Sequence, residues 1–119
     1  MGLLRWLTKN WANTEEPTHA DLGPLTLPIS PAEAPERVRA VVANLPRWRV
    51  ESTDATGRLH LTRRTRTARF IDDVILRFVP AGAGTLIHAE SRSRVGKGDL
   101  GQNRRNILEL WAALREFKV

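Results

Sequence analysis

The 119-residue chain contains no cysteine and no tyrosine, and aromatic residues make up only 6% of it. Without cysteine, disulfides, thiolate nucleophiles, iron–sulfur clusters and cysteine-ligated zinc sites are excluded. No apolar run is long enough to span a bilayer, and the first residues lack the long apolar stretch and cleavage site of a secretory signal. These features lead us to expect a cytoplasmic protein, with peripheral membrane attachment as an alternative.

Basic residues outnumber acidic ones, so the formal net charge is +6 and the pI is about 11.2. Such an excess favours an anionic small molecule, an acidic protein or an anionic membrane surface as partner, although it also serves solubility alone. Nucleic acid is disfavoured, because no aromatic residue that could stack on bases interleaves with the main arginine run. That run, which could follow one strand, comprises Arg58, Arg63, Arg64, Arg66 and Arg69.

Residues 1–12 show helical periodicity, since Leu3, Leu7 and Trp11 recur every four residues. The spacing predicts a short amphipathic helix. Leucine and tryptophan beside cations suit a membrane surface, while docking on the rest of the chain or on a partner would also stabilise so short a helix. Residues 13–29 are rich in proline, threonine and glycine and predict a linker or arm.

Residues 30–119 carry the patterns of one folded domain. A helix is predicted where Val38 and Val42 share an apolar face, and Pro46 ends it. Four segments of alternating apolar and polar residues then predict strands joined by short turns. The helical spacing of Ile107 and Leu110 predicts a closing helix.

We therefore predict an α+β fold: a single antiparallel four-stranded sheet with two helices on one face, in the order α-β-β-β-β-α. Short connections favour antiparallel pairing, because parallel neighbours need long crossovers. The short N-terminal amphipathic helix would precede this domain. The second face of the sheet would be open to water, to a ligand or to a partner, and the oligomeric state stays undetermined.

Two adjacent acids, Asp72 and Asp73, stand just before an apolar strand, although aspartate is a poor strand former. Strict alternation places Asp72 on the core side, where its carboxylate needs a hydrogen-bond or ionic partner. A bulge between the two residues would instead expose both. They could ligate a hard cation or act as general acid and base, or one could simply bond backbone amides or an arginine.

The segment 91–105 joins the last strand to the last helix and combines glycines with clustered cations. Glycine permits close backbone approach, and a helix N-terminus presents unpaired N–H groups, so the segment is a candidate anion site. The candidate ligand-binding residues are Arg92, Arg94, Gly96, Lys97, Gly98, Asp99, Gly101, Asn103, Arg104 and Arg105. Alternatively Asp99 caps the helix, and the arginines pair with Asp72, Asp73 or Glu90.

No segment shows a catalytic or cofactor motif, and we expect no cofactor, no metal and no catalytic residue. Lys97 follows Gly96, but the next residue is Gly98 rather than the serine or threonine of a phosphate-binding loop. His60 and His88 share outward parity with Glu90 nearby, but their spacing does not require zinc.

The stretches 69–74 (RFIDDV) and 91–105 (SRSRVGKGDLGQNRR) together resemble the domain of unknown function 1499 family. Family members pair a Phe-x-Asp-Asp-Val strand with a loop of the form Ser-Arg-x-Gly-x-x-Asp-x-Gly-x-Asn-x-x-Arg and a closing helix. The matching residues are Asp72, Asp73, Ser93, Arg94, Gly96, Asp99, Gly101 and Asn103, with Arg104 or Arg105 near the last position. The resemblance supplies no activity, but it implies that the aspartates and the arginines of the loop meet in space.

We therefore expect a non-enzymatic binding or interaction domain that takes an anionic ligand or an acidic partner at the segment 91–105. One alternative is an enzyme or metal-binding protein that uses Asp72 and Asp73. A second is a protein held at a membrane surface by residues 3–12.

Overall fold

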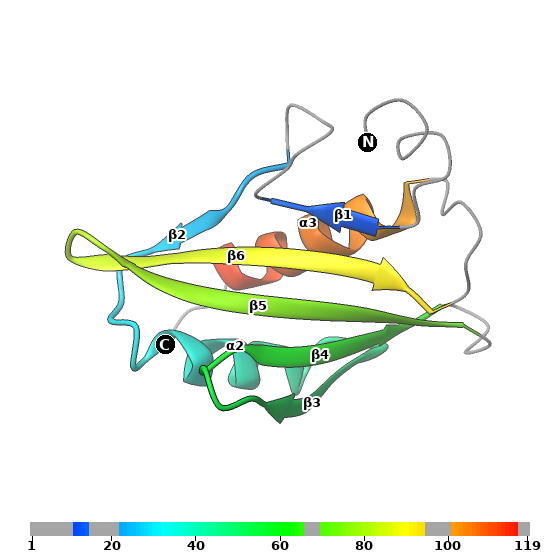
Figure 1. Cartoon of the computed structure of the whole chain (residues 1–119), viewed down its shortest axis with the longest axis horizontal. Coiled ribbons are helices and arrows are strands. Elements are labelled where there is room, and N and C mark those ends of the chain that lie inside the picture. Colours follow the sequence, from blue (N-terminus) through cyan, green and yellow to red (C-terminus); the bar gives the residue numbers. More distant parts are fainter. Residues whose placement is uncertain (1–10, 15–21, 66–69, 95–100, 117–119) are drawn as a thin grey trace.

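The computed structural model describes residues 11–14, 22–65, 70–94 and 101–116 (Figure 1). Its strands are β1 (Trp11–Asn13), β2 (Leu25–Leu27), β3 (Trp48–Thr53), β4 (Leu59–Arg64), β5 (Ile71–Ala81) and β6 (Gly84–Ser93). Its helices are α2 (Ala34–Val42) and α3 (Gln102–Glu116). Neither of these helices is long and apolar enough to cross a membrane.

The strands form one six-stranded sheet in which β1, β6, β5, β4 and β3 follow one another and β2 also pairs with β6. All of the pairings are antiparallel. Strands β5 and β6 form a long hairpin, whose tight turn places Gly82 at a φ of 59°, a conformation that favours glycine. This hairpin lies at the centre of the sheet, because β1 and β2 flank it on one side and β4 and β3 on the other.

The predicted four-stranded sheet is therefore wrong, because β1 and β2 add two short strands along the edge of β6. Residues 11 and 12 of the predicted N-terminal helix lie in β1, while residues 1–10 fall outside the described part of the chain. The predicted arm over 13–29 contains β2, with Leu25 opposite Ile87. Three-residue strands carry little local signal, and what stabilises them is pairing with a strand distant in sequence.

Both helices lie on one face of the sheet, behind it in the view of Figure 1, and the core lies between these layers. Alternation along β4, β5 and β6 directs one set of apolar side chains inward, as the sequence predicted. The interior side chains that are fully shielded from solvent include Val38, Leu59, Leu61, Val74, Leu76, Ile87, Ile107 and Leu110.

Ser30 and Glu33 form a hydrogen-bonded turn just before helix α2. The hydroxyl of Ser30 accepts a hydrogen bond of 3.1 Å from the Glu33 amide and donates one of 3.1 Å to the Glu33 carboxylate. The regular helix then starts at Ala34, and Pro35 occupies the first turn, where a missing N–H costs nothing.

The opposite face of the sheet is covered by neither described helix (Figure 1). Its side chains come from the alternate positions of the same strands. Candidate functional groups therefore fall into two sets, one on this open face and one between the sheet and α3.

Candidate functional site

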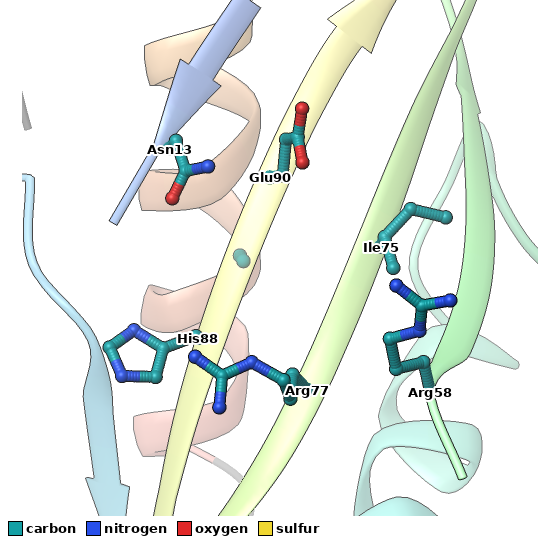
Figure 2. Close-up of a pocket in the computed structure, with 7 residues that line it drawn as sticks. Asn13, Arg58, Ile75, Arg77, His88 and Glu90 are labelled. Carbon is teal, nitrogen blue, oxygen red and sulfur yellow. The ribbon is translucent and has the colours of Figure 1, made fainter. Parts of the chain in front are cut away.

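A hollow of about 120 Å³ lies in the open face over the centre of the sheet (Figure 2). The strand register builds it from two neighbouring rows: Glu90 stands opposite Ile75 and Asn13, and Arg77 stands opposite His88. The described residues that line it are Asn13, Arg58, Ile75, Arg77, His88, Ala89 and Glu90.

The cationic groups of this hollow are Arg58, which immediately precedes β4, and Arg77 of β5. Figure 2 shows Arg77 extending from β5 toward His88 on β6, while the Arg58 guanidinium lies beside Ile75. Arg58 is held by Asp54, with 2.7 Å between the guanidinium Nε and a carboxylate oxygen. Hydrogen bonds to Asp54, first from the Thr56 side chain, hold the pKa of its carboxyl well below the usual range. This charged turn therefore positions Arg58 at the rim.

The junction of β1 and β2 along β6 borders the hollow at His88. Thr14 closes this junction, because its backbone N–H donates to Ala89 and its hydroxyl accepts from the Ala89 N–H, both at 3.0 Å. The same hydroxyl lies 3.0 Å from Nδ1 of His88. Donation from Thr14 to Nδ1 leaves the ring proton of a neutral His88 on Nε2.

Two more arginines on the open face are paired with carboxylates. Arg94 forms a two-bonded ion pair with Asp73, both N···O distances being 2.9 Å. Asp73 also accepts from Nε2 of His60 at 2.8 Å. The hydrogen bonds from Arg94 and then His60 lower the pKa of Asp73, against the opposing effect of burial. Arg92 pairs with Glu90, the one carboxylate in the hollow.

A family model described as "Protein of unknown function (DUF1499)" matches residues 7–114 of the chain. The chain belongs to this family. No curated protein and no solved structure matches it. The family description names no activity, so function has to be argued from the residues themselves.

Three of the residues that resemble the DUF1499 motif point inward and form a polar network against α3. The buried carboxylate of Asp72 accepts a hydrogen bond of 2.8 Å from the Asn106 amide. That amide also lies 3.2 Å from the Ser91 hydroxyl, which donates at 2.7 Å to Asn103. Asn103 in turn donates to the Ser93 hydroxyl at 2.9 Å. The motif thus joins β5 and β6 to the first turns of α3.

The two adjacent aspartates of the DUF1499 motif lie on opposite faces of the sheet. The register runs without interruption from Asp72 opposite Ser93 to Asp73 opposite Arg92, so no bulge separates them. Asp72 is only 3% exposed and bonds an amide, while Asp73 bonds Arg94 and His60. The two carboxylates therefore cannot ligate one metal ion or act together as acid and base. The expected contact between an aspartate and a loop arginine is present for Asp73.

The other candidates in the segment 91–105 are divided between these faces. Arg92 and Arg94 are exposed at the end of β6. Gly101 has a φ of 83°, and its carbonyl accepts from the Arg105 amide at 3.0 Å. Arg105 is exposed and donates to Gln102 at 3.1 Å, whereas Arg104 is half-buried. The remaining candidates, Gly96, Lys97, Gly98 and Asp99, lie outside the described residues.

The predicted arginine stripe does not lie on one face. Arg63 is only 8% exposed and turns inward, where its guanidinium Nε donates to Glu109 of α3 at 2.9 Å. The same carboxylate oxygen accepts from the indole of Trp48 at 2.5 Å. Burial raises the pKa of Glu109, and these hydrogen bonds outweigh it, so the net shift is downward. Arg64 is exposed, and Arg66 and Arg69 fall outside the described residues.

The histidines do not combine into a metal site. His60 stands opposite Ile75 and bonds Asp73, while His88 stands opposite Arg77 and bonds Thr14. Within the described ranges, no three histidine or acidic side chains gather closely enough to hold a metal ion.

Sequence reasoning missed two residues that matter here. Asn106 interrupts the apolar stripe of α3 that Ile107 and Leu110 continue, and a polar residue in such a stripe signals a buried polar partner. Arg77 shares outward parity with Asp73, which identifies its face but not its neighbours. Arg77 lies opposite His88 because of the register between β5 and β6, and the sequence alone does not give that register.

Proposed function

We propose that this DUF1499 domain binds a small anion, carried as a phosphate or carboxylate group, in the hollow of the open sheet face. Arg92 and Arg94, at the start of the segment 91–105, lie on the same face, and Arg92 pairs with Glu90 of the lining. The observation that carries the proposal is that two arginines line the same small hollow, Arg58 beside Ile75 and Arg77 toward His88. Guanidinium groups bind planar oxyanions through paired N–H donors.

The charge balance around the hollow supports an anion. Three guanidinium groups, those of Arg58, Arg77 and Arg92, stand with two carboxylates, those of Asp54 and Glu90. The excess is positive. Asp54 and Glu90 each hold an arginine side chain in place. Less side-chain conformational entropy is therefore lost when a ligand binds.

The size of the hollow supports a small ligand group. Its volume, about 120 Å³, is well below that of pockets for drug-sized molecules, which start at about 300 Å³. The lining combines the apolar Ile75 with polar groups of Asn13 and the arginines, which suits a group held by its charged end. These features support binding rather than a chemical step.

Isothermal titration with inorganic phosphate and with succinate tests the proposal. We expect the full chain to bind one of them, and Arg77→Gln to weaken binding about tenfold or more, as for a lost charged hydrogen bond of about 1.5–3 kcal/mol. Arg115→Gln, an exposed arginine at the end of α3, is the matched control and should bind as the wild type does.

The same titration separates the hollow from the segment 91–105. Lys97→Ala should leave affinity within about twofold if the hollow is the site, since Arg58 and Arg77 supply the cationic groups there. If Lys97→Ala lowers the affinity strongly and Arg77→Gln does not, the anion binds at the segment 91–105 and not in the hollow. The absence of binding at millimolar concentrations of either anion would refute the proposal.

A further inference from the structure

A second concave surface lies on the opposite side of the molecule from β1, where α2 meets the edge strand β3. It is a groove of about 360 Å³, lined by Arg39, Val42, Ala43, Trp48, Arg49 and Val50. The residues come from one helix and one strand, so the groove runs between them. It shares no lining residue with the hollow of the open face.

Among the described strands, β3 is last in the sheet and pairs only with β4, so its outer edge has no strand partner in this part of the chain. The Arg64 amide donates to the Arg47 carbonyl at 2.9 Å, so Arg47 and Arg64 form a hydrogen-bonded pair. Alternation then makes Trp48 and Val50 non-hydrogen-bonded positions relative to β4. The Trp48 carbonyl and both backbone groups of Val50 therefore point toward the outer edge.

The edge offers pairing over a short length only. The Trp48 amide already donates to Leu45 at 3.2 Å, and the register with β4 shifts between Val50 and Ser52. Such irregularities limit open-ended strand addition and aggregation. They leave a segment of about three residues, which matches capture of a short extended peptide rather than growth of the sheet.

The charges around the groove select the occupant. Arg39 and Arg49 line it, and Arg47 is exposed at the start of β3. Arg39 also reaches across from α2 to the Thr53 hydroxyl at 2.5 Å, with Glu36 as an exposed neighbour at 3.7 Å. A second copy of the chain would bring these arginines against their own counterparts, which is repulsive. An acidic segment would instead be attracted.

The start of β3 is also held in an uncommon conformation. Arg47 has a φ of 73°, in the left-handed region that side chains other than glycine rarely adopt. Such a conformation persists only where the surrounding structure imposes it. Here it turns the chain from α2 into β3 and so sets the direction of the groove.

From these features we propose that the α2–β3 groove binds an extended acidic peptide segment of a partner protein by strand addition to β3. Backbone groups of Trp48 and Val50 pair with the peptide backbone. Alternate peptide side chains enter the groove against Val42, and its carboxylates meet Arg39 and Arg49. This mode obtains affinity from main-chain hydrogen bonds and specificity from the alternate side chains.

Fluorescence anisotropy with the full chain tests this, using a labelled eight-residue peptide in which valine alternates with glutamate. The proposal predicts saturable binding below about 1 mM. A peptide with lysine in place of glutamate should bind at least tenfold more weakly. So should the acidic peptide with N-methyl groups on alternate amides, because methylation removes the donors that strand addition uses.

Protein variants localise the binding. Arg49→Gln should weaken the acidic peptide at least fivefold, while Arg115→Gln and Arg77→Gln should leave its affinity unchanged. Equal binding of the acidic and the basic peptide, tolerance of N-methylation, or no binding at about 1 mM would each overturn the proposal. Dimerisation of the chain through β3, seen by light scattering and abolished by Val50→Pro, which removes an N–H of the outer edge, would show that a second copy occupies the groove instead.

Discussion

Asn106 of α3 donates a hydrogen bond of 2.8 Å to the carboxylate of Asp72 on β5, and both side chains are buried. A charged group in the interior needs such a donor, because desolvation without a partner is costly. Asn106 also contacts Ser91 at 3.2 Å and accepts from Gln102 at 2.6 Å. One amide thus links the helix to both strands of the central hairpin.

We expect Asn106→Ala to lower the free energy of unfolding by about 2–3 kcal/mol, because it leaves buried polar groups of Asp72 and Ser91 without their donor. Urea denaturation followed by circular dichroism measures the loss. Asn44→Ala is the matched control: Asn44 is exposed and makes a single long bond of 3.4 Å, so its removal should change stability by less than about 0.5 kcal/mol. Equal losses in both variants would contradict a special role for the network.

The pairing of Asp73 with Arg94 predicts a pH-dependent contribution on the open face. Because the folded state lowers the pKa of Asp73, the pair stabilises the fold above the ordinary carboxyl pKa of about 3.9. The contribution is lost as the pH falls through the lower pKa of the folded state. At neutral pH the free energy of unfolding of the wild type should exceed that of Asp73→Asn by about 0.5–1 kcal/mol, the range of exposed ion pairs.

Thermal unfolding of wild type and Asp73→Asn from about pH 2 to pH 6 measures that difference. It should be constant from pH 5 to pH 6 and shrink toward the acid end. Glu36→Gln removes a carboxylate whose distance to Arg39 is 3.7 Å on an exposed helix face, and it should cost less than Asp73→Asn at pH 6. A difference for Asp73→Asn that grows with acidification would reverse the sign and refute the pairing.

Local periodicity was sufficient to predict the strands in which one face is apolar. Leu59 and Leu61 on β4, and Val74 and Leu76 on β5, point inward as their alternation requires. The two three-residue strands β1 and β2 were missed, because their partners on β6 lie some sixty or more residues away. No window of neighbouring residues contains that information.

The candidate site shows a similar division. Alternation placed Asp72 inward, but its partner Asn106 depends on the rotation of α3 against the sheet, which spacing alone does not determine. The prediction of an arginine stripe was wrong at Arg63, because this residue lies on the same inward face of β4 as Leu59 and Leu61. An arginine can occupy this inward position because Glu109 supplies a carboxylate from the facing helix.

This Arg63–Glu109 pair provides a third prediction. Glu109→Ala should lower the free energy of unfolding by about 3 kcal/mol, because it leaves a largely buried guanidinium without its carboxylate and removes the acceptor of the Trp48 indole. Glu116→Ala, an exposed position on the same helix, is the control and should be nearly neutral. Urea unfolding of both variants measures the two losses, and a loss below about 1 kcal/mol for Glu109→Ala would show that the pair adds little.

Gly84 lies at a close approach between β2 and the central hairpin. A Cβ at this position would lie 2.4 Å from the Leu27 carbonyl oxygen, a contact that the backbone cannot relieve without moving β2 away from β6. We expect Gly84→Ala to cost about 1–3 kcal/mol, the range for overpacking. At Gly23, by contrast, an added Cβ meets nothing within 4 Å. Gly23→Ala should therefore leave the melting temperature close to that of wild type.

Hydrogen exchange at the amides of β2 distinguishes this clash from a general loss of stability. In Gly84→Ala the amides of Leu25 and Leu27 should exchange faster relative to global unfolding, because the added methyl group displaces the strand that carries them. The core amides of β5 and β4, which pair with each other far from the substitution, should slow or quicken only with the global change in stability. Uniform acceleration throughout the sheet would mean that β2 unfolds together with the central hairpin. In that case the two short strands missed by local periodicity would belong to the same cooperative unit as the four strands that it predicted.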